Sequence, residues 1–207
     1  MKLRRWQFLL ISMLIILIIL ALGTDRYFAL VRQAQEQIRL QRTEQIVSGT
    51  LPSRGGHQYT ATTMPLLSPS GFSPARFERA FAGTGLEGIG EALALAEAET
   101  DINALVLAAI IVHESGWGRS RIAKEKNNLA GLGAYDGREY SAGIKFDSRT
   151  ASIMFLAELL AVHYAPGGQF YGGSHDLAGI GVRYASDPRW AAKVAGCMRV
   201  IVGRAAS

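Results

Sequence analysis

The chain of 207 residues contains almost no cysteine, since Cys197 is the only one. A single thiol excludes a disulfide within the chain and a zinc site built on cysteines. The sequence also lacks internal repeats and a basic domain. Its net charge is +5, yet residues 73–207 carry 14 basic and 14 acidic side chains and are therefore neutral. Because nucleic-acid-binding domains carry a basic patch, nucleic acid is not an expected partner.

Charged residues are absent from residues 6–23, an apolar run that follows Lys2, Arg4 and Arg5. As an α-helix this run would extend about 27 Å, close to the bilayer core of about 30 Å. Because the basic flank lies on its N-terminal side, the positive-inside rule predicts one transmembrane helix with a cytoplasmic N-terminus. Cleavage after residues 21–23 is the alternative. Signal peptides usually have apolar segments of only about 7–15 residues, so we expect an uncleaved anchor.

The composition divides the chain into three parts. Residues 1–24 are the basic flank and anchor. Within residues 25–72, the stretch 25–47 is rich in Gln, Arg and Glu, which favours a juxtamembrane helix. Residues 48–70 are rich in Ser, Thr, Gly and Pro, which favours a spacer, with an ordered extension that wraps the domain as the alternative. The folded domain is predicted over residues 73–207.

Apolar periodicity and capping residues predict that this domain is mainly α-helical. Ser73 and Pro74 combine an N-cap with proline at the first helical position. A third helix is capped by Asp101 or Asn103 and ends near Ser115. Helices are expected over residues 74–82, 88–100, 103–115, 120–127, 150–164 and 188–203. Loops are expected elsewhere, with a small β-hairpin possible within residues 131–147 and a Gly-rich loop over 166–181.

Glu114 follows residues 105–112, the most apolar segment outside the anchor. A helix that ends here would hold the carboxyl group partly against apolar surroundings and partly in a cleft. Loss of solvation favours the neutral form of a carboxyl group, and a neutral acid is what protonates a glycosidic oxygen. The structural alternative is a helix-end glutamate that pairs with Arg119 or Arg121.

His113 and Glu114 also begin like the zinc-protease motif. Four residues after His113, however, the sequence has Trp117 in place of the second histidine. The spacing therefore excludes this metal site. No metal and no cofactor are expected.

Residues 114–120 read Glu-Ser-Gly-Trp-Gly-Arg-Ser, and residues 123–131 read Ala-Lys-Glu-Lys-Asn-Asn-Leu-Ala-Gly. These stretches resemble the glucosaminidase family of peptidoglycan hydrolases, glycoside hydrolase family 73. Residues 184–194, Tyr-Ala-Ser-Asp-Pro-Arg-Trp-Ala-Ala-Lys-Val, resemble a second block of the same family. The two blocks occur in the family's order, and the resemblance covers roughly residues 75–203.

The resemblance implies a lysozyme-like helical domain with a small β-lobe and a cleft for a glycan strand. It implies an endo-β-N-acetylglucosaminidase that cleaves the β-1,4 bond on the reducing side of N-acetylglucosamine. By the same resemblance, Glu114 is the general acid and Tyr184 lies near it in the cleft. The family's second carboxylate lies in the β-hairpin. Glu139 is the nearest match, and Asp136 and Asp147 compete with it.

If no second carboxylate lies opposite Glu114, a distant base or the substrate's own acetamido group would take its role. Asn127 and Asn128 are candidate substrate-binding residues whose amides are expected to orient the cleft floor. Trp117 either stacks on a sugar or pins the loop beneath Glu114. Trp190 is open to the same two interpretations.

The sequence thus predicts a membrane-anchored peptidoglycan hydrolase, with its catalytic domain outside the cell facing the wall. Its expected partners are peptidoglycan glycan strands, the membrane through residues 6–23, and as a further candidate another membrane protein. One alternative is a lytic transglycosylase, which is disfavoured because residues 127–132 replace the Gly-Leu-Met-Gln-type block of that class. The other is a non-catalytic glycan-binding or scaffold module.

Overall fold

The structure is a computed structural model that describes residues 24–48, 60–133 and 139–207. The anchor predicted over residues 6–23 lies outside these ranges. Among the helices that are described, none combines the length and apolarity needed to span a bilayer. The chain divides into two compact units, Met1–Arg39 and Leu40–Ser207.

Helix α2 (Thr24–Ser48) confirms the helix predicted over residues 25–47. Its last nine residues belong to the larger unit. There Leu40, Ile46 and Val47 are buried, and Glu44 forms a salt bridge with Arg76. The larger unit therefore includes the end of α2, which precedes the domain boundary expected at residue 73.

The rest of the described chain is helical with connecting loops, as predicted. Most helix limits agree with the sequence to within a few residues. The helices are α3 (Pro74–Phe81), α4 (Gly90–Thr100), α5 (Ala104–Ser115), α6 (Arg121–Lys126), α7 (Glu139–Ala142), α8 (Arg149–His163), α9 (Leu177–Tyr184) and α10 (Trp190–Ala206).

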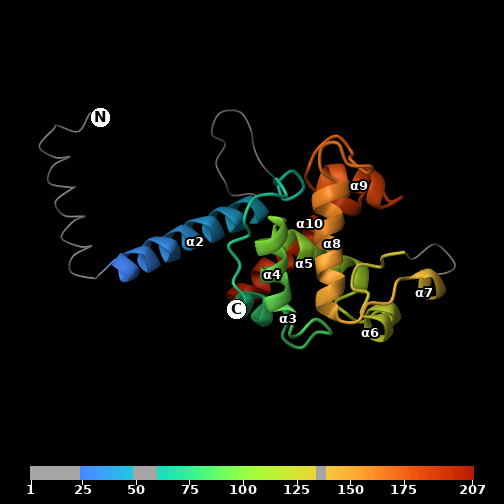
Figure 1. Cartoon of the computed structure of the whole chain (residues 1–207), viewed down its shortest axis with the longest axis horizontal. Helices are drawn as coiled ribbons and strands as arrows, with labels where there is room; N and C mark the ends of the chain where they lie inside the picture. Colours follow the sequence, from blue (N-terminus) through green and yellow to red (C-terminus); the bar gives the residue numbers. More distant parts are fainter. Residues whose placement is uncertain (1–23, 49–59, 134–138) are drawn as a thin grey trace, which may run out of the picture. The chain divides into compact units, whose positions relative to one another are not determined.

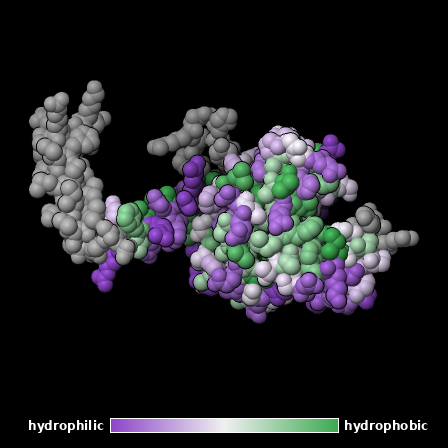
Figure 2. Space-filling model, in the orientation of Figure 1, coloured by the Kyte–Doolittle hydropathy of each residue, from purple (hydrophilic) through white to green (hydrophobic). Residues whose placement is uncertain are grey.

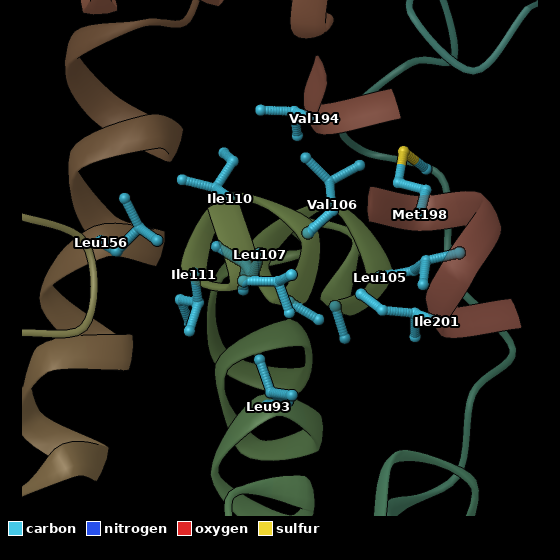
Figure 3. Close-up of a cluster of buried hydrophobic side chains, with 14 of the residues drawn as sticks. Leu93, Leu105, Val106, Leu107, Ile110, Ile111, Leu156, Val194, Met198 and Ile201 are labelled. Carbon is cyan, nitrogen blue, oxygen red and sulfur yellow. The ribbon is translucent and has the colours of Figure 1, made fainter. Parts of the chain in front are cut away.

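Helix α5 is the centre of the domain and contacts α4, α8 and α10 (Figure 1). All its residues from Ala104 to Val112 are buried, since a helix that is apolar on every side must be enclosed by others. Leu107, Ile110 and Ile111 meet side chains of α4 and α8, with α10 on another side (Figure 3). The core thus fixes the position of α5 within the domain.

Asn103, and not Asp101, caps α5. Its side-chain oxygen accepts hydrogen bonds from the backbone amides of Leu105 and Val106. Asp101 instead ends α4 in the left-handed conformation, with φ of 59°.

Residues 60–72 form an ordered extension and not the favoured spacer. Met64 and Leu66 are fully buried, at 1% and 0% exposure. The Leu66 amide donates to the His175 carbonyl at 3.0 Å. Glu97 accepts hydrogen bonds from the Ser70 amide at 2.6 Å and the Ser70 hydroxyl at 2.9 Å. These contacts attach the extension to the helices.

The expected β-hairpin is not found, because the described part of residues 131–147 contains α7 and no strand. Tyr140 in α7 is held against α6. Its hydroxyl donates to Glu125 at 2.7 Å, and the guanidinium of Arg121 lies 3.9 Å from its ring centre. These side-chain contacts hold the segment in a helical turn.

Helix α9 was missed, because its two glycines resemble a loop in the sequence. Asp176 caps it by accepting from the Gly179 amide at 2.9 Å. A Cβ atom on Gly179 would lie 1.9 Å from the carbonyl oxygen of Ser174, and one on Gly172 would lie 2.1 Å from that of Gly179. These glycines allow backbone segments to approach closely, which sequence periodicity does not report.

The surface of the larger unit mixes residue types. On the face shown in Figure 2, hydrophilic and hydrophobic residues are interspersed.

Candidate active site

Glu114 is the last residue but one of α5, where the buried helix reaches the surface. Ser115 is buried and fixes the turn: its hydroxyl donates to the Ile111 carbonyl at 2.6 Å and accepts from the Gly118 amide at 2.8 Å. Gly116 ends the helix with φ of 56°, a left-handed conformation that suits glycine. The turn leaves the Glu114 side chain half-buried.

Glu114 lines a cavity of about 630 Å³. The other walls come from residues 130–133, from Leu159 and Tyr164 at the end of α8, and from residues 184–187. Both sequence blocks that carry the family resemblance therefore meet at one cavity. The volume lies within the range of about 300–1,000 Å³ typical of small-ligand sites.

The two oxygens of the Glu114 carboxyl group have different neighbours. Oε1 accepts a hydrogen bond from the indole Nε1–H of Trp190 at 2.7 Å. Oε2 lies beside Gly131, where an added Cβ atom would be 4.0 Å away. Trp190 is only 2% exposed, so this bond is inside the protein and Oε2 is the oxygen toward the cavity wall at Gly131.

Tyr184, the last residue of α9, lies at the same cavity, as the resemblance implied. Its ring stacks on Trp190 with a centroid distance of 4.8 Å, and its hydroxyl donates to the Ala130 carbonyl at 3.3 Å. Burial, followed by the charge of Glu114, raises the pKa of the Tyr184 phenol well above 10. The phenol is therefore protonated at every physiological pH.

Asp187 is a cavity-lining carboxylate that the sequence did not select. Its Oδ2 accepts from the Lys193 ammonium at 2.5 Å and its Oδ1 from the Arg189 amide at 2.9 Å. The hydrogen bond from Lys193, followed by that from Arg189, lowers the pKa of Asp187. Asp187 is therefore ionised at neutral and mildly acidic pH. The motif that contains it was recognised, but the motif alone did not show that its carboxylate faces the cavity.

None of the three candidates for the second carboxylate is seen at the cavity in the described part of the structure. Glu139 lies in α7, but its side chain is not among the described side chains, and Asp136 lies outside the described residues. Asp147 is exposed and does not line the cavity. Among the carboxylates that the structure describes, Asp187 is the one that shares the cavity with Glu114.

Trp117 packs away from the cavity, which supports the loop-pinning interpretation over sugar stacking. Its ring meets Phe81 edge-on at 6.4 Å, and the Arg204 guanidinium lies 5.5 Å from its centre. Trp117 adopts φ of 61° in the turn after α5. It therefore joins this turn to α3 and α10.

Asn128 is fully buried at 0% exposure and is not among the residues that line the cavity. Its amide donates to the carbonyls of Leu132 at 2.8 Å and Ile144 at 2.9 Å, and accepts from the Leu132 amide at 2.9 Å. Asn127 donates to the Phe146 carbonyl at 3.1 Å and does not line the cavity. Both side chains shape the loop that forms the cavity floor.

The fold and the cavity define a small helical domain that presents one half-buried glutamate to an open site. The sequence model of the glucosaminidase family, described as mannosyl-glycoprotein endo-beta-N-acetylglucosaminidase, matches residues 90–201. The chain belongs to this family of glycoside hydrolases.

Two provisionally named endo-beta-N-acetylglucosaminidases from strains of Streptococcus pneumoniae are 40% identical to the chain over 116 residues. The match covers 56% of this chain but only 18% and 16% of those relatives, which are therefore several times longer.

Solved structures of Staphylococcus aureus autolysin E share the fold. Autolysin E itself has a TM-score of 0.55 at 22% identity, covering 70% of each chain. A catalytic mutant of it in complex with the disaccharide NAG-NAM has a TM-score of 0.54 at 22% identity, covering 67% of this chain and 70% of that one. These similarities confirm a helical domain of the autolysin E type.

Proposed function

We propose that this chain hydrolyses the β-1,4 bond after N-acetylglucosamine in peptidoglycan strands, with Glu114 as the general acid. The observation that carries the proposal is the half-buried Glu114 carboxyl group in the cavity where both family blocks meet. Membership of the glucosaminidase family supports the reaction. The NAG-NAM disaccharide and the NAM-L-Ala-D-iGlu muropeptide bound by autolysin E support the substrate class.

The residues around the cavity suit cleavage of a glycosidic bond. Glu114 protonates the leaving oxygen, and positive charge then develops at the anomeric carbon. Asp187, which Lys193 and Arg189 keep ionised, supplies negative charge at the same cavity. Such fixed charge stabilises the oxocarbenium-like transition state. Tyr184 contributes a neutral hydroxyl group beside Glu114.

The attacking water needs a base or a participating group. The oxygens of Asp187 are already bonded to Lys193 and Arg189, which makes Asp187 a weak base and favours an electrostatic role. Glu139, on the segment next to the cavity floor, and the substrate's acetamido group are the two candidates for activating the nucleophile.

We further propose that residues 6–23 anchor the chain in the cell membrane, with the N-terminus in the cytoplasm and the domain facing the cell wall. The basic flank at Lys2, Arg4 and Arg5 supports this orientation. A domain that is neutral over residues 73–207 suits a glycan partner better than a polyanion. Another membrane protein is a further candidate partner of the anchor.

The test is Glu114→Gln, assayed on purified peptidoglycan. The amide keeps the size of the side chain but cannot act as an acid, so we expect activity to fall by roughly 10²–10⁴-fold, with folding unchanged by circular dichroism. Glu99→Gln is the matched control, since Glu99 is exposed on α4 and away from the cavity. It should retain wild-type activity.

Mass spectrometry of the products distinguishes the alternatives. Reducing N-acetylglucosamine ends agree with the proposal. Anhydromuramic ends would identify a lytic transglycosylase. A wild-type chain that binds the glycan without cutting it would identify a non-catalytic module.

A further inference from the structure

The hydrogen bond between Trp190 and Glu114 determines which carboxyl oxygen carries the acid's proton. An indole nitrogen can only donate. With Nε1–H directed at Oε1 over 2.7 Å, Oε1 must accept in both ionisation states of Glu114. The carbonyl oxygen of a neutral carboxyl group is a stronger acceptor than its hydroxyl oxygen, so the bond from the indole favours Oε1 as the carbonyl oxygen and Oε2 as the oxygen that holds the proton.

We propose that Trp190 is a positioning residue that orients the Glu114 carboxyl group and places its proton on Oε2, toward the cavity. This inference rests on the proposed role of Glu114 as the acid. Trp190 itself need not touch the substrate, because it is 2% exposed and does not line the cavity.

The surroundings of Trp190 hold its ring in place. The ring of Tyr184 stacks on it at 4.8 Å, and the ring of His113 meets it edge-on at 6.5 Å. The backbone amide of Trp190 donates to the Asp187 carbonyl at 3.0 Å. Because α10 also packs along α5, the donor and the acceptor belong to two helices with a shared core.

The other oxygen is left with room in front of it. Oε2 faces Gly131, which lacks a side chain, at a distance of 4.0 Å to an added Cβ atom. A glycosidic oxygen can therefore approach Oε2, while the approach to Oε1 is occupied by the indole. The two oxygens have separate tasks: Oε1 anchors the group and Oε2 donates the proton.

The same hydrogen bond also assists the proton transfer. When Glu114 gives up its proton, the hydrogen bond from Trp190 becomes charge-assisted and stronger. Trp190 thus stabilises the carboxylate that forms in the transition state, which affects kcat more than substrate binding.

The test is Trp190→Phe, which keeps an aromatic ring against Tyr184 but removes the N–H donor. We expect kcat on peptidoglycan to fall roughly 10- to 100-fold with little change in KM, as for loss of a hydrogen bond to a charged group. The basic limb of the kcat–pH profile should move to higher pH. The reason is that the Glu114 carboxylate loses the hydrogen bond from the indole, so the active acid form is kept to a higher pH. In the Glu114→Gln background, Trp190→Phe should have no further effect.

The matched control is Trp117→Phe, which makes the same change beside α3, outside the cavity. Its basic limb should stay in the wild-type position. A Trp190→Phe enzyme that loses activity with an unmoved pH profile would show a purely structural role and overturn the inference.

A second measurement does not depend on catalysis. In the ¹⁵N-labelled chain, the indole N–H signal of Trp190 should shift with pH as Glu114 ionises, and Glu114→Gln should abolish that shift. The chain has three tryptophans, so Trp117→Phe helps to assign the signals. A Trp190 signal that does not depend on Glu114 would overturn the inference even if Trp190→Phe does not fold. If the wild type cuts no glycan but the signal follows Glu114, the proposed function fails while the hydrogen bond stands.

Discussion

At the scale of single residues, Gly131 leaves open the space in front of the Glu114 Oε2 atom. It adopts φ of +65° and an added Cβ atom would lie 4.0 Å from Oε2. Substitution therefore has two separable effects. One is backbone strain, since the left-handed conformation costs other residues about 1–2 kcal/mol. The other is a methyl group where the leaving oxygen of the substrate must approach.

We predict that Gly131→Ala lowers kcat/KM at least about tenfold, because displacing reacting groups by about 1 Å can cost about 100-fold in rate. Gly83→Ala is its control, since Gly83 has φ of +72° and nothing within 4 Å of an added Cβ atom. The two variants should lose similar stability in thermal melts, and only Gly131→Ala should lose activity. Equal activities would place the reacting oxygen elsewhere.

The motifs that carry the family resemblance selected Glu114 and Tyr184, and the structure brings both to one cavity. They did not identify the roles of Trp190 and Asp187, although both lie in a recognised block. A motif reports that residues occur together, whereas the direction of an indole N–H depends on how α10 packs on α5. The full burial of Asn128 likewise depends on the approach of Leu132 and Ile144, whose carbonyls accept hydrogen bonds from its amide.

At the scale of elements, α5 shows how a buried helix positions the proposed general acid. Its apolar residues enclose it among α4, α8 and α10, and Glu114 emerges only at its end. The apolar run and the following Gly116 were identified from the sequence, which left Asp101 and Asn103 as alternative caps. Helix α9 was not identified, because its glycines allow close contacts that tertiary packing sets: Gly179 approaches residues 172–174 and Gly181 approaches Trp190.

Only the last turns of α2 belong to the larger unit and bury side chains there. We predict that a chain starting at residue 40 melts within about 2 °C of the full chain, and that one starting at residue 49 melts about 10 °C lower or more. The second chain loses the buried Leu40, Ile46 and Val47, and each such side chain contributes about 1.5–3 kcal/mol when fully buried.

Both truncated chains should be compared by circular dichroism melts under identical conditions. Both truncated chains contain residues 49–59, so they differ only in residues 40–48. A shorter chain as stable as the longer one would show that these residues do not belong to the folded unit.

At the scale of the whole molecule, we expect residues 6–23 to lie in the membrane and residues 73–207 to face the cell wall. Residues 6–23 are uncharged and apolar, and residues 73–207 are neutral overall. An anchored domain of this kind would work on wall material near the membrane.

We predict that a phosphatase reporter fused after Ser207, which is active only outside the cytoplasm, is active in cells. The reason is the basic flank before residues 6–23, which keeps the N-terminus inside. Deletion of residues 6–23 is the control and should abolish reporter activity. Activity of a cytoplasmic reporter at the same position would contradict the proposed location.

The sequence by itself determined the helical class and the limits of most helices, which depend on periodicity and capping residues. Its resemblance to the glucosaminidase family indicated the family and selected Glu114 as the proposed acid. All of these rest on local stretches of the chain. Only the tertiary structure decided that Trp190 bonds to one oxygen of Glu114, that Asp187 faces the cavity and that residues 60–72 pack on the domain. Each of these depends on segments far apart in the sequence, whose approach is set by packing of the core.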